Sequence, residues 1–207
     1  MMNPDKIKNI LFDLGGVIYD IDPARTQKAI EALLTNKEEV LFYSKSRQIE
    51  AISLYEIGAI ETPEFIAAVR KELNLSASDE QITDAWNALL TGLVDGRVKQ
   101  LESLAKHYNM ALLSNTNALH FDAIWADCQP VYAQMQRCFF SFQMGKRKPN
   151  ADIFETVIAE MGWKKEETIF VEDSPPNIAG AQAIGLPVFP IHQLSDFERL
   201  VERLMGG

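Results

Sequence analysis

From residue 95 to the C-terminus, short apolar runs alternate with segments of helical pattern. The apolar runs predicted as strands span residues 110–114, 138–142, 168–171 and 187–191. The segments predicted as helices span residues 98–107, 118–125, 151–161, 178–184 and 195–204. Strands that alternate with helices of this length are joined by right-handed crossovers, so the strands are expected to lie parallel in one sheet.

One further apolar run, residues 7–14, lies far upstream of the others. It is expected to join the same sheet, because an isolated strand cannot bury two apolar faces. The intervening segment carries helical spacing throughout, and Asp22-Pro23 is typical of a helix start. We therefore predict an α/β fold: a Rossmann-like, doubly wound core of residues 1–21 and 95–207, with an all-helical domain of residues 22–94 inserted in it.

Charge and cysteine content exclude several classes of function. The 207 residues include 20 Lys and Arg against 29 Asp and Glu, a net charge of −9. This balance argues against nucleic acid or an anionic membrane surface as a partner. Cys128 and Cys138 fit neither a disulfide framework nor a zinc motif, and no apolar run reaches the ~18 residues of a membrane span. We expect a cytoplasmic protein, and nothing in the sequence defines an oligomeric state.

Polar residues follow four of the five predicted strands of the core. Asp13 ends the first strand and Ser114-Asn115 ends the second. A basic cluster, 146–148, follows the third, and Glu172-Asp173 follows the fourth. Ligands of an open parallel sheet bind beyond the carboxyl ends of its strands, so we expect these groups to meet at one edge.

This set of groups has a chemical logic. Carboxylates and a backbone carbonyl suit Mg²⁺, and a metal ion with a lysine can neutralise a phosphoryl group. A carboxylate in line with phosphorus can attack it. Each motif also has an ordinary structural interpretation, as a turn, a helix cap, a solvated loop or a helix-starting acid pair. Their common position at strand ends favours the catalytic interpretation.

Four segments together resemble the motifs of the haloacid dehalogenase-like hydrolase superfamily. They are ILFDLGGVIYDID, ALLSNTN, GKRKPNADIF and IFVEDSPPNIAGAQAIG, in that order along the chain. The helical insertion resembles the small cap domain of this superfamily. Within it, the first two segments are most similar to the branch of sugar-phosphate phosphatases that contains α-D-glucose-1-phosphate phosphatase. The resemblance implies an Mg²⁺-dependent phosphatase acting on a small phosphorylated metabolite such as a sugar phosphate.

The resemblance also implies roles for the acidic residues. Asp13 would be the nucleophile, forming an aspartyl-phosphate, and a direct ligand of Mg²⁺. Gly15 would offer its backbone carbonyl to the metal, and Asp173 its carboxylate. Glu172 would act on the metal indirectly, through water or through the residues around it.

Three further residues receive roles from the same resemblance. Ser114 and Asn115 would hold phosphate oxygens, and Lys148 would pair with both Asp13 and the phosphate. Lys146 and Arg147 are interpreted as loop charges. The cap would contact the leaving group, with the segments near 35–37 and 55–60 as candidates.

One position departs from the family pattern. Family phosphatases usually carry a second Asp, a general acid, where this chain has Gly15. Asp20 or Asp22 could substitute, or the leaving group could be acidic enough to need no help. Position 15 could also require a backbone conformation that only glycine adopts easily.

Two other activities remain open for such a sequence. A dehalogenase needs a nucleophilic Asp without a general acid, but it does not depend on Mg²⁺. It would also need a halide-binding Arg, for which Arg25 is the nearby candidate. A phosphate-binding module that has lost turnover is the third possibility, and intact Asp13, Lys148 and Asp173 argue against it.

Overall fold

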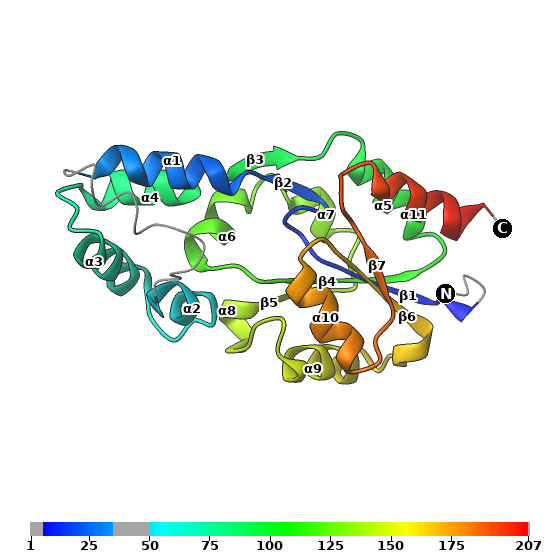
Figure 1. The fold of residues 1–207 in the computed structure, drawn as a ribbon. Helices are drawn as coiled ribbons and strands as arrows, with labels where there is room; N and C mark the ends of the chain where they lie inside the picture. Colours follow the sequence, from blue (N-terminus) through cyan, green and yellow to red (C-terminus); the bar gives the residue numbers. More distant parts are fainter. Residues whose placement is uncertain (1–5, 35–49, 207) are drawn as a thin grey trace.

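A five-stranded parallel sheet forms the centre of the protein (Figure 1). The computed structural model describes residues 6–34 and 50–206. The strands run in the order β5 (Arg137–Phe140), β4 (Asn109–Ser114), β1 (Asn9–Phe12), β6 (Thr168–Glu172) and β7 (Val188–Pro190). This order places the N-terminal strand in the middle of the sheet and confirms the doubly wound α/β fold.

Helices cover both faces of the sheet because its strands are apolar on both sides. The helices α5 (Arg97–Leu104), α6 (Ala118–Ile124), α7 (Gln129–Tyr132) and α11 (Asp196–Met205) pack with Ile10 and Phe12 of β1. On the other face, α9 (Ala151–Met161) and α10 (Pro175–Ala183) pack with Leu11. The alternation of Ile10, Leu11 and Phe12 between two cores is the period of two expected of a strand.

A third hydrophobic core lies among the inserted helices. These are α1 (Pro23–Leu33), α2 (Glu50–Glu56), α3 (Thr62–Glu72) and α4 (Asp79–Asn87). Phe65 and Ile82 are fully buried at its centre, with Trp86 beside them. Asp22 caps α1, since its side chain accepts a hydrogen bond from Ala24 N at 3.0 Å.

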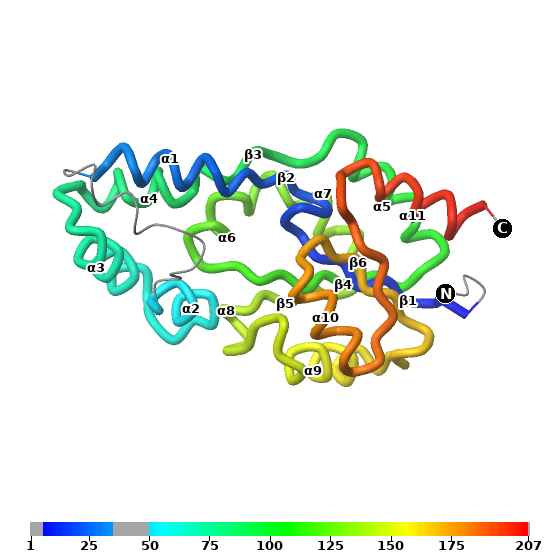
Figure 2. The backbone as a smooth tube through the Cα atoms, viewed as in Figure 1, coloured from blue at the N-terminus to red at the C-terminus, as the bar shows by residue number. Residues whose placement is uncertain are grey.

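The insertion does not consist of helices alone. β2 (Tyr19–Ile21) pairs antiparallel with β3 (Leu90–Leu93), so the chain leaves the core and returns to it side by side (Figure 2). The prediction of helices throughout 22–94 is therefore corrected for its last residues. The segment is four residues long and contains Gly92, and its partner strand lies about 70 positions earlier, so no local pattern marks it.

The remaining elements are short. α8 (Ser141–Met144) begins where β5 ends, so the predicted strand 138–142 is shorter than expected. A 3-10 helix spans Lys165–Glu167. Among the described residues, no helix is long and apolar enough to cross a membrane.

Candidate active site

Lys148 lies at the centre of the polar residues beyond the strand ends. Its Nζ donates hydrogen bonds to Asp13 Oδ1 at 2.7 Å, Glu172 Oε2 at 2.8 Å and the Leu113 carbonyl at 3.0 Å. All three polar side chains are buried: Lys148 is 1% exposed, Asp13 7% and Glu172 0%. A buried cation is tolerable only with such compensation. The predicted meeting of Asp13, Lys148 and Glu172 at one sheet edge is thus what the structure shows.

Asn115 fixes the backbone of Lys148. Its Nδ2 donates to the Lys148 carbonyl and its Oδ1 accepts from the Lys148 N–H, both at 2.9 Å. Both ends of the amide are therefore engaged, whereas the resemblance implied a contact with phosphate oxygens. Ser114 ends β4 beside it and is buried, and its role toward phosphate stays a prediction.

Three carboxyl groups converge next to Lys148. Asp13, Glu172 and Asp173 each offer an oxygen, and these oxygens lie within 4.8 Å of one another. Glu172 is already saturated, since Oε1 accepts from the N–H groups of Asp173 and Ser174 at 3.1 and 3.0 Å. Its Oε2 accepts from Asn177 Nδ2 at 3.1 Å as well as from Lys148. This leaves Asp13 and Asp173 as the carboxylates free to bind an ion directly.

The pKa values follow from burial and from this crowding. Burial, and then the negative charge of Glu172, raise the pKa of Asp13 to about 7. Burial and the contact with Glu172 likewise raise the pKa of Asp173 to about 7. Burial also opposes ionisation of Glu172, but the charge of Lys148 and the hydrogen bonds that Glu172 accepts together hold the pKa of Glu172 below its usual value. A divalent cation would relieve this repulsion, and hard oxygen donors suit Mg²⁺, so the donor set fits the expected metal.

The two glycines after Asp13, Gly15 and Gly16, differ in whether a side chain could be accommodated at their positions. Gly16 has a φ of +76°, and a Cβ there would lie 2.3 Å from Asp173 Oδ2. A Cβ at Gly15 would meet only the end of a side chain, Ile21 Cδ1, at 3.2 Å, and Gly15 is not among the residues with positive φ. Glycine is therefore required at 16, whereas the backbone at 15 is open to other residues, which answers the question that the sequence left open.

Replacing Gly16 with Ala is expected to weaken Mg²⁺ binding by roughly 10- to 100-fold, because the new methyl group displaces Asp173. Gly96→Ala is the matched control, since Gly96 has the same φ of +76° and open space around its Cβ position. Both variants should lose about 1–2 kcal/mol of stability from the left-handed backbone. Titration of each with Mg²⁺ checks this, and equal affinities for the two variants would contradict it.

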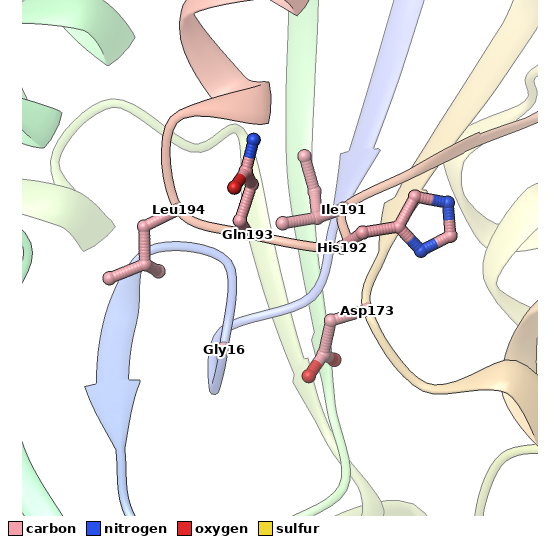
Figure 3. Close-up of a pocket in the computed structure, with 6 residues that line it drawn as sticks. All are labelled: Gly16, Asp173, Ile191, His192, Gln193 and Leu194. Carbon is pink, nitrogen blue, oxygen red and sulfur yellow. The ribbon is translucent and has the colours of Figure 1, made fainter.

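A pocket of about 260 Å³ opens beside Asp173 (Figure 3). Gly16 and Asp173 lie on one side of it, and residues 191–194, which follow β7, lie on the other. Because Asp173 is half-buried while Asp13 and Glu172 are buried, this pocket gives solvent a path to the Asp173 carboxylate.

The candidate substitutes for the missing acid are engaged elsewhere. Asp20 lies in β2, where its Oδ2 accepts a hydrogen bond from Thr91 Oγ1 at 2.7 Å. Asp22 is the cap of α1. Arg25, the candidate halide-binding residue, is exposed on α1. The segment 35–37, a candidate for leaving-group contacts, lies outside the described residues.

Comparison with known proteins agrees with this geometry. The sequence profile of the haloacid dehalogenase-like hydrolases matches residues 7–185, which include every candidate site residue. The chain belongs to the haloacid dehalogenase-like hydrolase family. The superfamily assignment made from the four motifs is therefore confirmed, and the protein is a hydrolase of this family.

Three relatives cover nearly the whole chain. A D-ribitol-5-phosphate phosphatase of Bacteroides thetaiotaomicron is 29% identical, over 93% of this chain and 96% of its own length. A structure of a haloacid dehalogenase family enzyme from the same organism, in complex with magnesium and inorganic phosphate, is 30% identical with a TM-score of 0.81, covering 94% and 98% of the two chains. The structure of a protein of Porphyromonas gingivalis described as a predicted haloacid dehalogenase-like family hydrolase is 28% identical with a TM-score of 0.83, covering 98% and 99% of the two chains.

Asn177 is the site residue that sequence reasoning did not single out. It lies near the start of α10, four positions after Asp173, and its amide holds the oxygen of Glu172 that Lys148 also binds. The four-residue spacing from Asp173 was the only signal that the sequence offered for Asn177. A residue one helical turn past a strand end can point back toward that strand end.

Proposed function

We propose that this protein is an Mg²⁺-dependent phosphatase that hydrolyses a small phosphate ester, most simply a sugar or sugar-alcohol phosphate. The observation that carries the proposal is the buried Lys148 bridging Asp13 and Glu172, with Asp173 next to them. The phosphatase among the relatives, and the magnesium and phosphate bound by another, support it.

The reaction would proceed in two displacements at Asp13. The free carboxylate oxygen attacks phosphorus, the P–O bond to the leaving group breaks, and an aspartyl-phosphate forms. Water then attacks this phosphoryl group, releasing inorganic phosphate and restoring the carboxylate. Lys148 holds one oxygen of Asp13 so that the other can face the substrate, and it offers positive charge to the phosphoryl oxygens.

Magnesium, when bound, would neutralise charge that builds on the phosphoryl oxygens. Asp13, the Gly15 carbonyl and Asp173 would hold it directly. Glu172 would act on the metal indirectly, through the residues around it, since both of its oxygens accept hydrogen bonds from donors of the protein. Ser114 would donate to a phosphate oxygen, while Asn115 holds the loop of Lys148 in place.

The expected result of a phosphatase screen is release of inorganic phosphate from sugar and sugar-alcohol phosphates with Mg²⁺, and none with a chelator. At 100 times its Kd, Mg²⁺ should also stabilise the fold by about 2.7 kcal/mol, or roughly 5–10 °C in Tm. Asp173→Asn should remove most of this shift. Calorimetry and a phosphate assay measure both.

Two outcomes would replace the proposal. Release of chloride from a 2-haloacid without metal would identify a dehalogenase. Binding of inorganic phosphate without turnover of any ester would identify a phosphate-binding module.

A further inference from the structure

The cap helix α2 contacts the core directly beside Lys148. Arg147 Nη1 donates a hydrogen bond to Ser53 Oγ at 2.9 Å. Its Nη2 lies 3.0 Å from Glu56 Oε2. The two side chains therefore form an ion pair, although their angles do not meet the criteria of a hydrogen bond. Ser53 and Glu56 both belong to α2, and they are three residues apart, so they lie on one face of the helix. One guanidinium thus binds two side chains of the cap.

This contact is partly buried and tightly packed. The side chains of Arg147 and Glu56 are 24% and 20% exposed. Burial raises the pKa of Glu56, and the charge of Arg147 opposes the rise. Just after α2, a Cβ on Gly58 would lie 2.1 Å from the Phe142 carbonyl, so cap backbone presses on α8 of the core. An exposed ion pair would contribute little to stability. A partly buried ion pair in such a contact holds its two side chains in a defined geometry.

The residue after Arg147 is the buried lysine of the site. The backbone of Lys148 is fixed by Asn115, and its Nζ reaches Asp13 and Glu172. Among the described residues, the side-chain hydrogen bond and the ion pair of Arg147 both lie on α2, and neither involves these groups. The chain therefore offers a short covalent path from the cap to the catalytic lysine.

We propose that Arg147 is a positioning residue that ties the placement of the cap helix α2 to the placement of Lys148. This inference rests on the proposed function, because its consequence is read in turnover. When α2 is seated, Glu56 and Ser53 hold Arg147, and Lys148 stays aligned with Asp13. When α2 is displaced, Arg147 loses both partners, and the loop before Lys148 loses one of its anchors.

The cap is also attached on a second side, which the proposal does not use. Tyr55 OH accepts a hydrogen bond from Leu119 N at 3.1 Å, and Trp86 stacks on His120 with ring centroids 5.2 Å apart. Figure 2 shows α4 near α6 and α2 near α8. These contacts keep the cap attached when Arg147 is replaced, so the loss of one anchor is expected to alter alignment rather than folding.

The test compares Arg147→Ala, Glu56→Ala and the double variant in steady-state phosphate release. Glu56 is the informative position, since it lies on the cap and contacts none of Asp13, Lys148 and Glu172 in the described residues. Each single variant is expected to lower kcat by about 10- to 100-fold, the cost of a small misplacement at a reacting group. The double variant should be no worse than Arg147→Ala, because both changes break one link.

Two controls separate this role from a general effect of charge or stability. Lys146→Ala removes a neighbouring cation whose partners, Thr156 at 2.8 Å and Asp152 at 3.8 Å, lie in α9 of the core. It should keep kcat within about twofold, whereas Arg147→Lys should restore part of the loss by keeping the charge next to Glu56. Thermal melts must show each variant folded at the assay temperature. If Arg147→Ala fails this, Ser53→Ala with Glu56→Ala takes its place.

The proposal is overturned if Glu56→Ala keeps wild-type kcat, if the two losses multiply in the double variant, or if Lys146→Ala loses as much. A wild-type protein that releases no phosphate from any ester would instead reject the proposed function. These failures are distinguishable because the wild-type assay comes first.

Discussion

Replacing Asp13 with Asn is expected to lower phosphate release by at least about 10³-fold, since losing a nucleophile or its activating base costs roughly 10⁴- to 10⁶-fold in well-studied hydrolases. The physical reason is that the proposed function gives this one carboxylate two tasks. It is placed by Lys148 at 2.7 Å for attack on phosphorus, and it lies in the carboxylate cluster that suits Mg²⁺. An amide oxygen is a poor nucleophile and a weaker ligand, so both contributions fall together.

The fold should survive this substitution. The backbone N–H of Asp13 still donates to the Val171 carbonyl at 2.9 Å, and Lys148 keeps Glu172 as its charged partner. Asp84→Asn, an exposed acid on α4, is the control for loss of one negative charge. Phosphate release and thermal melts measure the two effects. A variant at position 13 with a tenth or more of wild-type activity would show that another group attacks phosphorus.

The position of the candidate site residues was predictable because each one follows a strand that its own sequence marks. IKNILFDL, NMALLS and TIFVE are short apolar runs, and a parallel sheet brings their carboxyl ends to one edge whatever the order of the strands. Asp13, Ser114 and Glu172 therefore needed no knowledge of tertiary contacts.

The contacts that position these residues were not predictable in the same way. Asn115 and Arg147 act on partners 33 and 94 positions away through hydrogen bonds that a polar loop residue could make with many groups. The strand β3 was not predictable for the same reason, since its pairing with β2 across the insertion decides its structure. The local sequence pattern indicates which residues are buried and whether they repeat as in a helix or a strand. The two hydrogen bonds and the strand β3 depend instead on where distant segments of the chain meet.

Replacing Gly15 with Asp is expected to raise the rate on simple alkyl phosphates by about 10²- to 10⁴-fold, the usual contribution of a general acid when the leaving group is poor. The wild-type rate should rise steeply from alkyl esters to sugar 1-phosphates to aryl or acyl phosphates, because leaving groups of lower pKa need less protonation. The new acid should flatten this dependence. Aryl phosphates, which gain little from protonation, should change least.

The structure allows this substitution at 15 and not at its neighbour. The Cβ of residue 15 would lie 3.2 Å from Ile21 Cδ1, which is the end of a flexible side chain and can shift by a few tenths of an ångström. Gly15→Asn is the matched control, since it has the same size and cannot deliver a carboxylic proton. A thermal melt of both variants separates loss of fold from a failed gain. Equal rates of the wild-type protein on alkyl and aryl phosphates, with chemistry rate-limiting, would mean that another residue already donates the proton. Asp20 and Asp22, held by Thr91 and by the start of α1, would then be replaced by Asn to find it, because Asn preserves both hydrogen-bonding positions while removing the acid.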